Sequence, residues 1–490
     1  MSDAPADPKA HSGAAAVQAL LQRAPFTGSG RVDTPQGELR YRTQVEFLPV
    51  HEGDWGAGEP SAAVMCTAYL KEVGEGEAPR PLCFAFNGGP GSASIWLQLG
   101  ALGPHRVRIQ DDGRAPPPPY AVEDNPLTWL RFFDLVFIDP PHTGWSLAAS
   151  DEARKALLSV DGDVKALNGV IRGWLQRHRR FNSALYLAGE SYGTTRGAAL
   201  ADSLQAVGVA LKGLILVSCA MDLQSLVFGP AHDLPYALFL PAMANTSQHH
   251  GLLKGSLGAS SQAAREAAED FVQRDYVAAL HAGARLSHDR QRQVARRVAQ
   301  LTGLAVDLVE QSRLRISDQA YFFEALRHRG EVVGRLESRV SGPMGAHRGR
   351  EWEFDPGIEA ITGPYGMAGQ AYFRQALNVD LNAPYQVLNG AVGKAWRWTR
   401  GDSTGNSHAC TTPDLARALR RQPHLKVLVA SGRYDLGTPY SATDWSLAQL
   451  DVPTEVAARI THRYYDAGHM MYTRQADLHR LYSDLADWLG

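Results

Sequence analysis

A short apolar run that leads directly into a Gly-x-Ser-x-Gly turn constrains this chain more than any other feature. Residues 185–188 are Leu-Tyr-Leu-Ala, the turn is Gly189-Glu-Ser-Tyr-Gly193, and residues 194–204 have helical composition. A nucleophilic serine needs such a sharp strand-to-helix turn, because its Oγ must stand clear of the sheet. The two glycines remove Cβ atoms that would collide in the turn. The segment therefore predicts Ser191 as a nucleophile.

The bare pentapeptide is not specific, because residues 401–405 (Gly-Asp-Ser-Thr-Gly) match it as well. No apolar strand precedes this second copy, and the motif has meaning only between a strand and a helix. We interpret Ser403 as an ordinary loop serine.

Further apolar runs of strand length recur along the chain. The middle ones are unbroken rather than alternating, which is typical of strands buried on both faces of a parallel sheet. Between two of them, the apolar residues of segment 160–175 recur at helical spacing, and strand–helix–strand order indicates an α/β fold. The predicted fold class is α/β, with a mostly parallel central sheet and helices on both faces. The runs are 82–86, 135–138, 185–188, 214–217, 427–430 and 463–465.

Composition shifts divide the chain into three parts. Residues 1–30 are rich in Ala, Pro, Gly and Ser, which predicts a mobile N-terminal arm. Residues 31–221 and 386–490 carry the strand runs and form the predicted core. Residues 222–385 lack the recurring strand-like apolar runs, and much of this stretch is dense in Ala, Arg, Gln and Glu. We expect a mainly helical cap inserted over the sheet edge, where α/β folds hold their sites.

A serine nucleophile needs a base and an orienting carboxylate. Asp435 follows the strand-like run 427–430, and His469 follows the run 463–465, so each lies in a strand-end loop. These positions predict Asp435 as the acid and His469 as the base. Asp466 is a rival acid, but it precedes His469 by only three residues. Other candidates have surface-like contexts, namely Asp444, Asp451, His462 and His479.

A glycine-rich loop follows the early strand 82–86 and reads Asn87-Gly88-Gly89-Pro90-Gly91. Clustered glycines let backbone N–H groups face a reacting centre, so this loop is a candidate oxyanion hole. A phosphate-binding loop is the alternative, but Pro90 has no N–H and no Lys follows as in a P-loop.

Together these segments resemble the serine carboxypeptidase family of α/β-hydrolases, the S10 peptidases. The carriers are Asn87-Gly-Gly-Pro-Gly91, Asn125-Pro126 with Trp129, Asp139-Pro-Pro-His-Thr-Gly-Trp-Ser146, Gly189-Glu-Ser-Tyr-Gly193 and Gly468-His-Met470. The resemblance implies Gly89 and Tyr192 as oxyanion donors. It also implies that Asn87, Gly88 and Glu190 help to bind a substrate's terminal carboxylate and that Met470 lines the leaving-group pocket.

The chain departs from the family pattern at several positions. Ala85 stands where the family usually has Trp, and Ala101 where it often has Glu, which weakens the prediction of carboxylate recognition. Ser92 replaces a common cysteine, and Thr194-Thr-Arg196 resembles the bacterial branch. The resemblance implies a secreted or vesicular protein, whereas no signal peptide is visible and a cytoplasmic location is the expectation.

Composition excludes several other classes of function. The 490 residues carry a formal charge of −2, which argues against nucleic-acid binding, and no apolar run is long enough for a membrane helix. The four cysteines form no CxxC pair, and no metal or cofactor is expected. The predicted function is a serine-type carboxypeptidase acting on a peptide or acyl substrate. An esterase or acyltransferase with the same triad, and a non-catalytic binding protein, are the alternatives; the sequence leaves open whether the chain forms a homodimer.

Overall fold

The computed structural model describes residues 8–52, 58–74, 76–346, 349–401 and 408–490. Its centre is one large sheet with the strand order β1-β2-β3-β7-β4-β9-β10-β13-β14, and the short strand β8 pairs with β3. Strands β7 to β14 of this order run parallel, while β1, β2 and β3 join antiparallel at one edge. The bounds are β1 Phe26–Thr34, β2 Gly37–Val50, β3 Ala62–Lys71, β4 Leu82–Phe86, β7 Asp134–Ile138, β8 Leu147–Ala148, β9 Leu185–Glu190, β10 Gly213–Val217, β13 Lys426–Gly432 and β14 Ile460–Tyr465.

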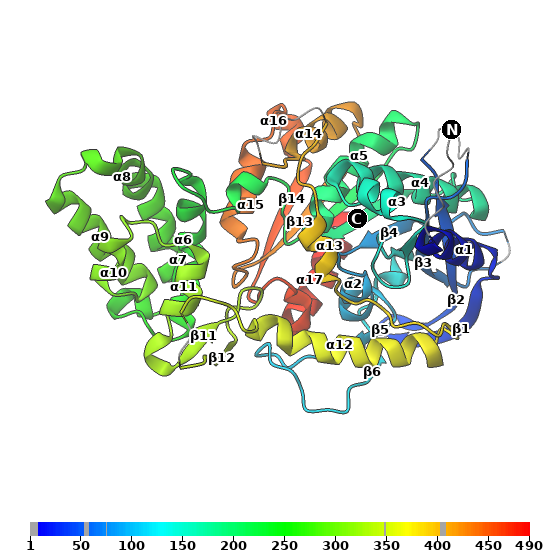
Figure 1. Cartoon of the computed structure of the whole chain (residues 1–490), viewed down its shortest axis with the longest axis horizontal. Coiled ribbons are helices and arrows are strands. Elements are labelled where there is room, and N and C mark those ends of the chain that lie inside the picture. The colour runs from blue at the N-terminus through cyan, green and yellow to red at the C-terminus, as the bar shows by residue number, and fades with distance from the viewer. Residues whose placement is uncertain (1–7, 53–57, 75, 347–348, 402–407) are drawn as a thin grey trace.

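Helices cover both faces of this sheet (Figure 1). Alternate residues of each central strand belong to two hydrophobic clusters, one on each face: Leu187 of β9 packs in one and Ala188 in the other. Burial on both faces explains why the strands are unbroken apolar runs. The predicted α/β fold is confirmed. One face carries α4 Val160–His178, α5 Tyr192–Ala206 and α14 Thr412–Arg421, and the other α1 Pro8–Gln22, α2 Ile95–Leu97, α12 Pro356–Gln375 and α17 Gln475–Leu489.

A helical lobe stands beside the sheet, on the left in Figure 1. It has its own hydrophobic cluster, which also includes Leu436 and Tyr440 of the core. Among the described helices, none is both long enough and apolar enough to cross a membrane. The lobe contains α6 Leu234–His249, α7 Ser261–Phe271, α8 Val277–Ala282, α9 His288–Thr302, α10 Val306–Gln311, α11 Asp318–Glu324 and the hairpin β11 Glu331–Val333 with β12 Ser341–Pro343.

Six further α-helices and β-strands of the described chain lie outside these groups. They are β5 His105–Val107 paired with β6 Val122–Asp124, α3 Asp151–Leu157, α13 Gly390–Ala395, α15 Tyr440–Ala448 and α16 Thr454–Ala457.

Two boundaries differ from the sequence-based expectation. The prediction of a mobile arm over residues 1–30 is wrong from residue 8 onward, because α1 packs Val17 into the core and β1 pairs along its length with β2. The cap ends before residue 385, because α12 returns to the core, where Tyr365 and Phe373 are fully buried. In both places, apolar partners distant in sequence supply the burial that local composition does not reveal.

Candidate active site

The turn around Ser191 joins β9 to α5 under backbone strain. Ser191 has φ 60° and ψ −129°, a conformation that L-residues rarely adopt. Its amide donates a hydrogen bond to the carbonyl of Val217 on the neighbouring strand, with an N–O distance of 2.9 Å. A side chain at Gly189 would collide with the carbonyl of Gly193, and one at Gly193 with that of Phe86. Both glycines are therefore required by close packing around the serine.

His469 and Asp435 are joined by a short hydrogen bond. The distance from His469 Nδ1 to Asp435 Oδ2 is 2.6 Å, and both side chains are buried. Thr438 holds the pair, since its hydroxyl donates to Asp435 Oδ2 at 2.6 Å and lies 3.2 Å from His469 Nδ1. The rival Asp466 instead pairs with Arg433, with its side chain about half exposed. Sequence reasoning missed Thr438, which carries no local signal.

The charges of this pair stabilise each other. Burial lowers the pKa of His469, but the Asp435 carboxylate raises it, and the net result is a raised pKa. Burial raises the pKa of Asp435, but His469 and the hydrogen bonds from Thr438 hold it below its usual value. An ionised Asp435 fixes Nδ1 of the imidazole as the protonated nitrogen, which leaves Nε2 available to accept a proton.

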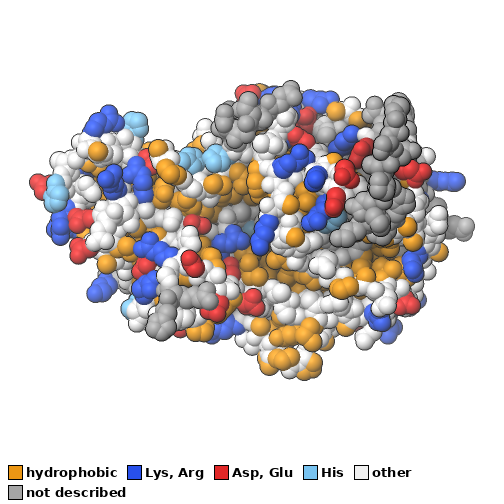
Figure 2. Space-filling view, in the orientation of Figure 1, with side chains coloured by type: hydrophobic (Ala, Val, Ile, Leu, Met, Phe, Trp, Pro, Cys, Tyr) orange, Lys and Arg blue, Asp and Glu red, His pale blue; other side chains and the backbone are white. Residues whose placement is uncertain are grey.

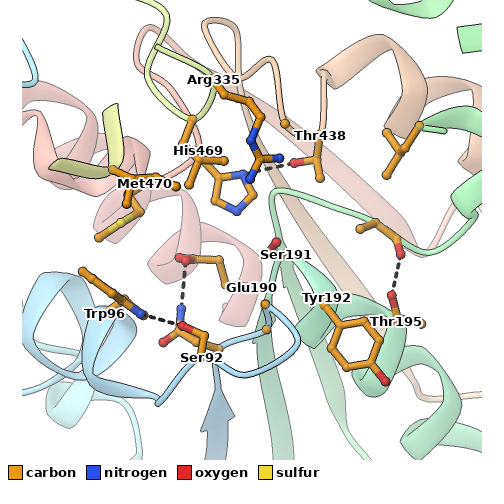
Figure 3. Close-up of a pocket in the computed structure, with 18 of the residues that line it drawn as sticks. Ser92, Trp96, Glu190, Ser191, Tyr192, Thr195, Arg335, Thr438, His469 and Met470 are labelled. Atoms are coloured by element: carbon orange, nitrogen blue, oxygen red, sulfur yellow. Dashed lines mark hydrogen bonds between the residues drawn. The ribbon is translucent and has the colours of Figure 1, made fainter. Parts of the chain in front are cut away.

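Ser191 and His469 lie next to each other in one pocket, with the Ser191 hydroxyl beneath the imidazole ring (Figure 3). The pocket has a volume of about 310 Å³ and lies between the core and the helical lobe, where the surface in Figure 2 is hollowed. Its lining includes Asn87, Gly88, Gly89, Glu190, Tyr192 and Met470. Eight of the nine residues predicted from the sequence thus line one cavity, and Asp435 lies behind His469. Ser403 lies outside the described residues.

The glycine-rich loop packs against the start of α5. A side chain at Gly88 would collide with the backbone nitrogens of Tyr192 and Gly193, and Gly89 has a φ of +100°, which favours glycine. Arg196 fixes this loop from below, donating to the Asn87 carbonyl at 2.5 Å and to Asp163 at 2.7 Å. The backbone of the loop therefore packs closely against the first residues of α5, next to Ser191.

Glu190 is a buried carboxyl group next to the serine. Its Oε1 accepts from Asn87 Nδ2 at 2.8 Å and its Oε2 from the Tyr472 hydroxyl at 2.6 Å. Burial raises the pKa of Glu190 to about 7, against the opposing effects of His469 and Tyr472. Tyr472 was not predicted, although it follows His469 by only three residues. This carboxyl can therefore be protonated and act as a donor near neutral pH.

The described residues contain no group of three or more His, Cys, Asp and Glu side chains arranged to hold a metal ion. The buried cysteines Cys66, Cys83 and Cys219 lie in the core.

Comparison with known proteins supports the predicted resemblance. Residues 69–231 match the family model of serine carboxypeptidases. Serine carboxypeptidase-like 13 of Arabidopsis thaliana is 25% identical over 39% of this chain and 46% of its own length. Pheromone-processing carboxypeptidase KEX1 of Yarrowia lipolytica is 30% identical over 35% of this chain and 26% of its own. The chain thus spans less than half the length of these curated relatives.

The fold is shared more widely than the sequence. The crystal structure of Kex1(delta)p, a prohormone-processing carboxypeptidase from Saccharomyces cerevisiae, aligns with 91% of this chain and 91% of its own. The TM-score is 0.53 at 15% sequence identity, so this likeness concerns the fold alone. The matched family segment contains Asn87 to Tyr192, whereas Asp435 and His469 lie outside it. The resemblance is confirmed: the chain has the α/β-hydrolase fold, and its residues 69–231 match the serine carboxypeptidase family.

Proposed function

We propose that this chain is a serine hydrolase, specifically a serine-type carboxypeptidase that releases C-terminal residues through an acyl-enzyme on Ser191. The observation that carries the proposal is one juxtaposition. A strained serine at a strand-to-helix turn shares a pocket with an imidazole whose Nδ1 is bonded to a buried carboxylate. The family match over residues 69–231 supports the same class of chemistry.

In the first half of the reaction, Ser191 Oγ attacks the scissile carbonyl carbon while its proton passes to His469 Nε2. The carbonyl oxygen becomes an oxyanion, for which the backbone N–H groups of Gly89 and Tyr192 are the proposed donors. When the C–N bond breaks, His469 returns the proton to the leaving amino group, and the acyl group stays on Ser191 as an ester.

In the second half, a water molecule repeats these steps. It gives one proton to His469, attacks the ester carbonyl, and releases the acid as Ser191 recovers its proton. Asp435 stays ionised throughout and stabilises the imidazolium that forms twice in the cycle.

Glu190 and Asn87 are the proposed contacts of the substrate's free C-terminus. A carboxyl group with a pKa of about 7 can donate a hydrogen bond to a carboxylate while it is protonated. The Asn87 amide and the Tyr472 hydroxyl hold the Glu190 oxygens on their other sides. Met470 lines the same pocket and is the proposed apolar contact of the leaving residue.

A fluorophosphonate probe and a substrate panel test the proposal. The probe should label Ser191, and Ser191→Ala should abolish labelling and lower kcat by about 10⁴-fold or more. Ser403→Ala, in the second pentapeptide, is the matched control and should keep wild-type labelling. The panel compares a blocked dipeptide, its C-terminal amide and a simple ester. Labelling of Ser191→Ala at the wild-type rate contradicts the assignment of Ser191 as the nucleophile. Turnover of the ester alone favours an esterase or acyltransferase.

A further inference from the structure

A cationic side chain that the mechanism does not use lies in the same pocket. Arg335 comes from the loop between β11 and β12 of the helical lobe and points toward His469 (Figure 3). Among the described residues that line the pocket, it is the one arginine or lysine. Its side chain is 41% exposed, so a bound molecule can reach it.

The backbone of Arg335 is held firmly against the catalytic loops. Its amide donates to Asp355 Oδ1 at 3.1 Å, and its carbonyl accepts from the amide of Leu436, next to Asp435, at 3.0 Å. The carbonyl of Leu336 accepts from the His469 amide at 2.6 Å. The lobe segment carrying Arg335 is therefore fixed relative to His469, which reduces the entropy lost when its side chain binds a ligand.

The guanidinium itself is left without a close partner in the described chain. Its nearest carboxylate is Asp355, with 4.0 Å between Nε and Oδ2, and none of the hydrogen bonds of the described residues uses a guanidinium nitrogen of Arg335. Arg339, four residues later, shows the contrast, since it donates twice to Glu337 at 2.8 and 2.7 Å. The planar donor fork of Arg335 is thus free to bind a carboxylate with two parallel hydrogen bonds.

Asp318 lines the pocket too and is the competing charge. It forms no ion pair with Arg335 among the described residues; burial raises the pKa of its carboxyl, although the charge of Arg335 acts in the opposite direction. Arg335 and Glu190 lie on opposite sides of the His469 ring in Figure 3. An anionic group at Arg335 is therefore separate from one held by Glu190 and Asn87.

We propose that Arg335 binds the side-chain carboxylate of an acidic residue of the substrate, which makes acidic peptides the preferred class. This inference rests on the proposed function. This carboxylate is distinct from the free C-terminus, because Glu190 and Asn87 are the proposed contacts of that terminus; the residue tested here lies on the acyl side of the scissile bond.

Binding without turnover separates this inference from the proposed chemistry. Calorimetry in the Ser191→Ala background would measure the Kd of benzyloxycarbonyl-Glu-Leu, benzyloxycarbonyl-Gln-Leu and the C-terminal amide of each. Adding Arg335→Gln should lower the preference for Glu over Gln by about tenfold, the value of one hydrogen bond to a charged group. Loss of the Glu-over-Gln preference supports the inference, whereas loss of the acid-over-amide preference alone assigns Arg335 to the C-terminus and contradicts it.

Two further variants act as controls. Arg335→Lys keeps the charge without the planar fork and should retain part of the preference. Arg274→Gln removes an arginine from the same lobe, where it is 76% exposed and paired with Asp270, and should change neither preference. The inference is overturned if Arg335→Gln melts at the wild-type temperature and leaves both the Glu-over-Gln and the acid-over-amide ratio of Kd unchanged. Hydrolysis of the same four compounds by the wild-type chain tests the proposed function independently.

Discussion

The guanidinium of Arg196 donates a hydrogen bond to the backbone carbonyl of Asn87, at 2.5 Å. Arg196 lies on α5, four residues after Tyr192, and its other contact is the buried carboxylate of Asp163 on α4. Its guanidinium also lies over the ring of Tyr192. One buried ion pair thereby fixes the glycine-rich loop against the helix that follows Ser191.

Replacing Arg196 should therefore cost both stability and turnover. Arg196→Met leaves the carboxylate of Asp163 buried without its cation, and we expect the free energy of unfolding to fall by about 3–5 kcal/mol. Urea unfolding measures this. Arg420→Met, which breaks a pair with an almost fully exposed Asp451, should cost at most about 1 kcal/mol. Equal losses in the two variants contradict a structural role for the Arg196 pair.

The choice of acid can be tested by two conservative substitutions. Asp435→Asn should keep the fold but lower kcat by about 10⁴-fold, because an amide at this position favours the wrong imidazole tautomer. Asp466→Asn should have little effect, since its carboxylate faces Arg433 and lies partly in solvent. Steady-state measurement of kcat for both variants tests this choice. A larger loss of kcat in Asp466→Asn than in Asp435→Asn would make Asp466 the acid.

The pKa of Glu190, about 7, predicts a pH dependence that only substrates with a free carboxylate should show. Below pH 7 Glu190 is protonated and donates a hydrogen bond to the carboxylate. Above pH 7 it is ionised and repels the like charge, so the KM of a peptide acid should rise. The peptide amide lacks that charge and should not change in this way.

The measurement for Glu190 is the acid-to-amide ratio of kcat/KM from about pH 5 to 9, a range that brackets the raised carboxyl pKa. Titration of His469 affects both substrates and cancels in this ratio. Glu190→Gln should flatten the profile, because a glutamine donates at every pH. A ratio that is flat in the wild type too removes the carboxylate role from Glu190.

Tyr472→Phe should move this pH profile. The Tyr472 hydroxyl stabilises the ionised form of Glu190 and so lowers its pKa. Without this hydroxyl, the midpoint of the acid-to-amide ratio of kcat/KM should move to a pH about one unit higher. A shift of this size corresponds to the loss of one hydrogen bond to a charged group. Tyr482→Phe, which loses only a long contact to Gln36, is the matched control. A midpoint that moves to lower pH contradicts the role of Tyr472.

The sequence by itself predicted the sheet and the candidate nucleophile. The central apolar runs appear as strands because burial on both faces leaves no polar positions in them, and 82–86 coincides with β4. Gly189 and Gly193 predicted the turn because a Cβ atom at either position would collide with the neighbouring backbone. Asp435 and His469 could be predicted from strand-end position, since the carboxyl ends of parallel strands meet at one edge.

Only the tertiary structure decided which side chains complete the pocket. Tyr472 meets Glu190 from 282 positions away, and Arg335 of the helical lobe lines the same pocket as His469. The same holds for β1 and α12, whose places depend on pairing with β2 and on packing into the core. No local pattern encodes such contacts, because their free energy comes from burial and hydrogen bonding between segments that become neighbours only on folding.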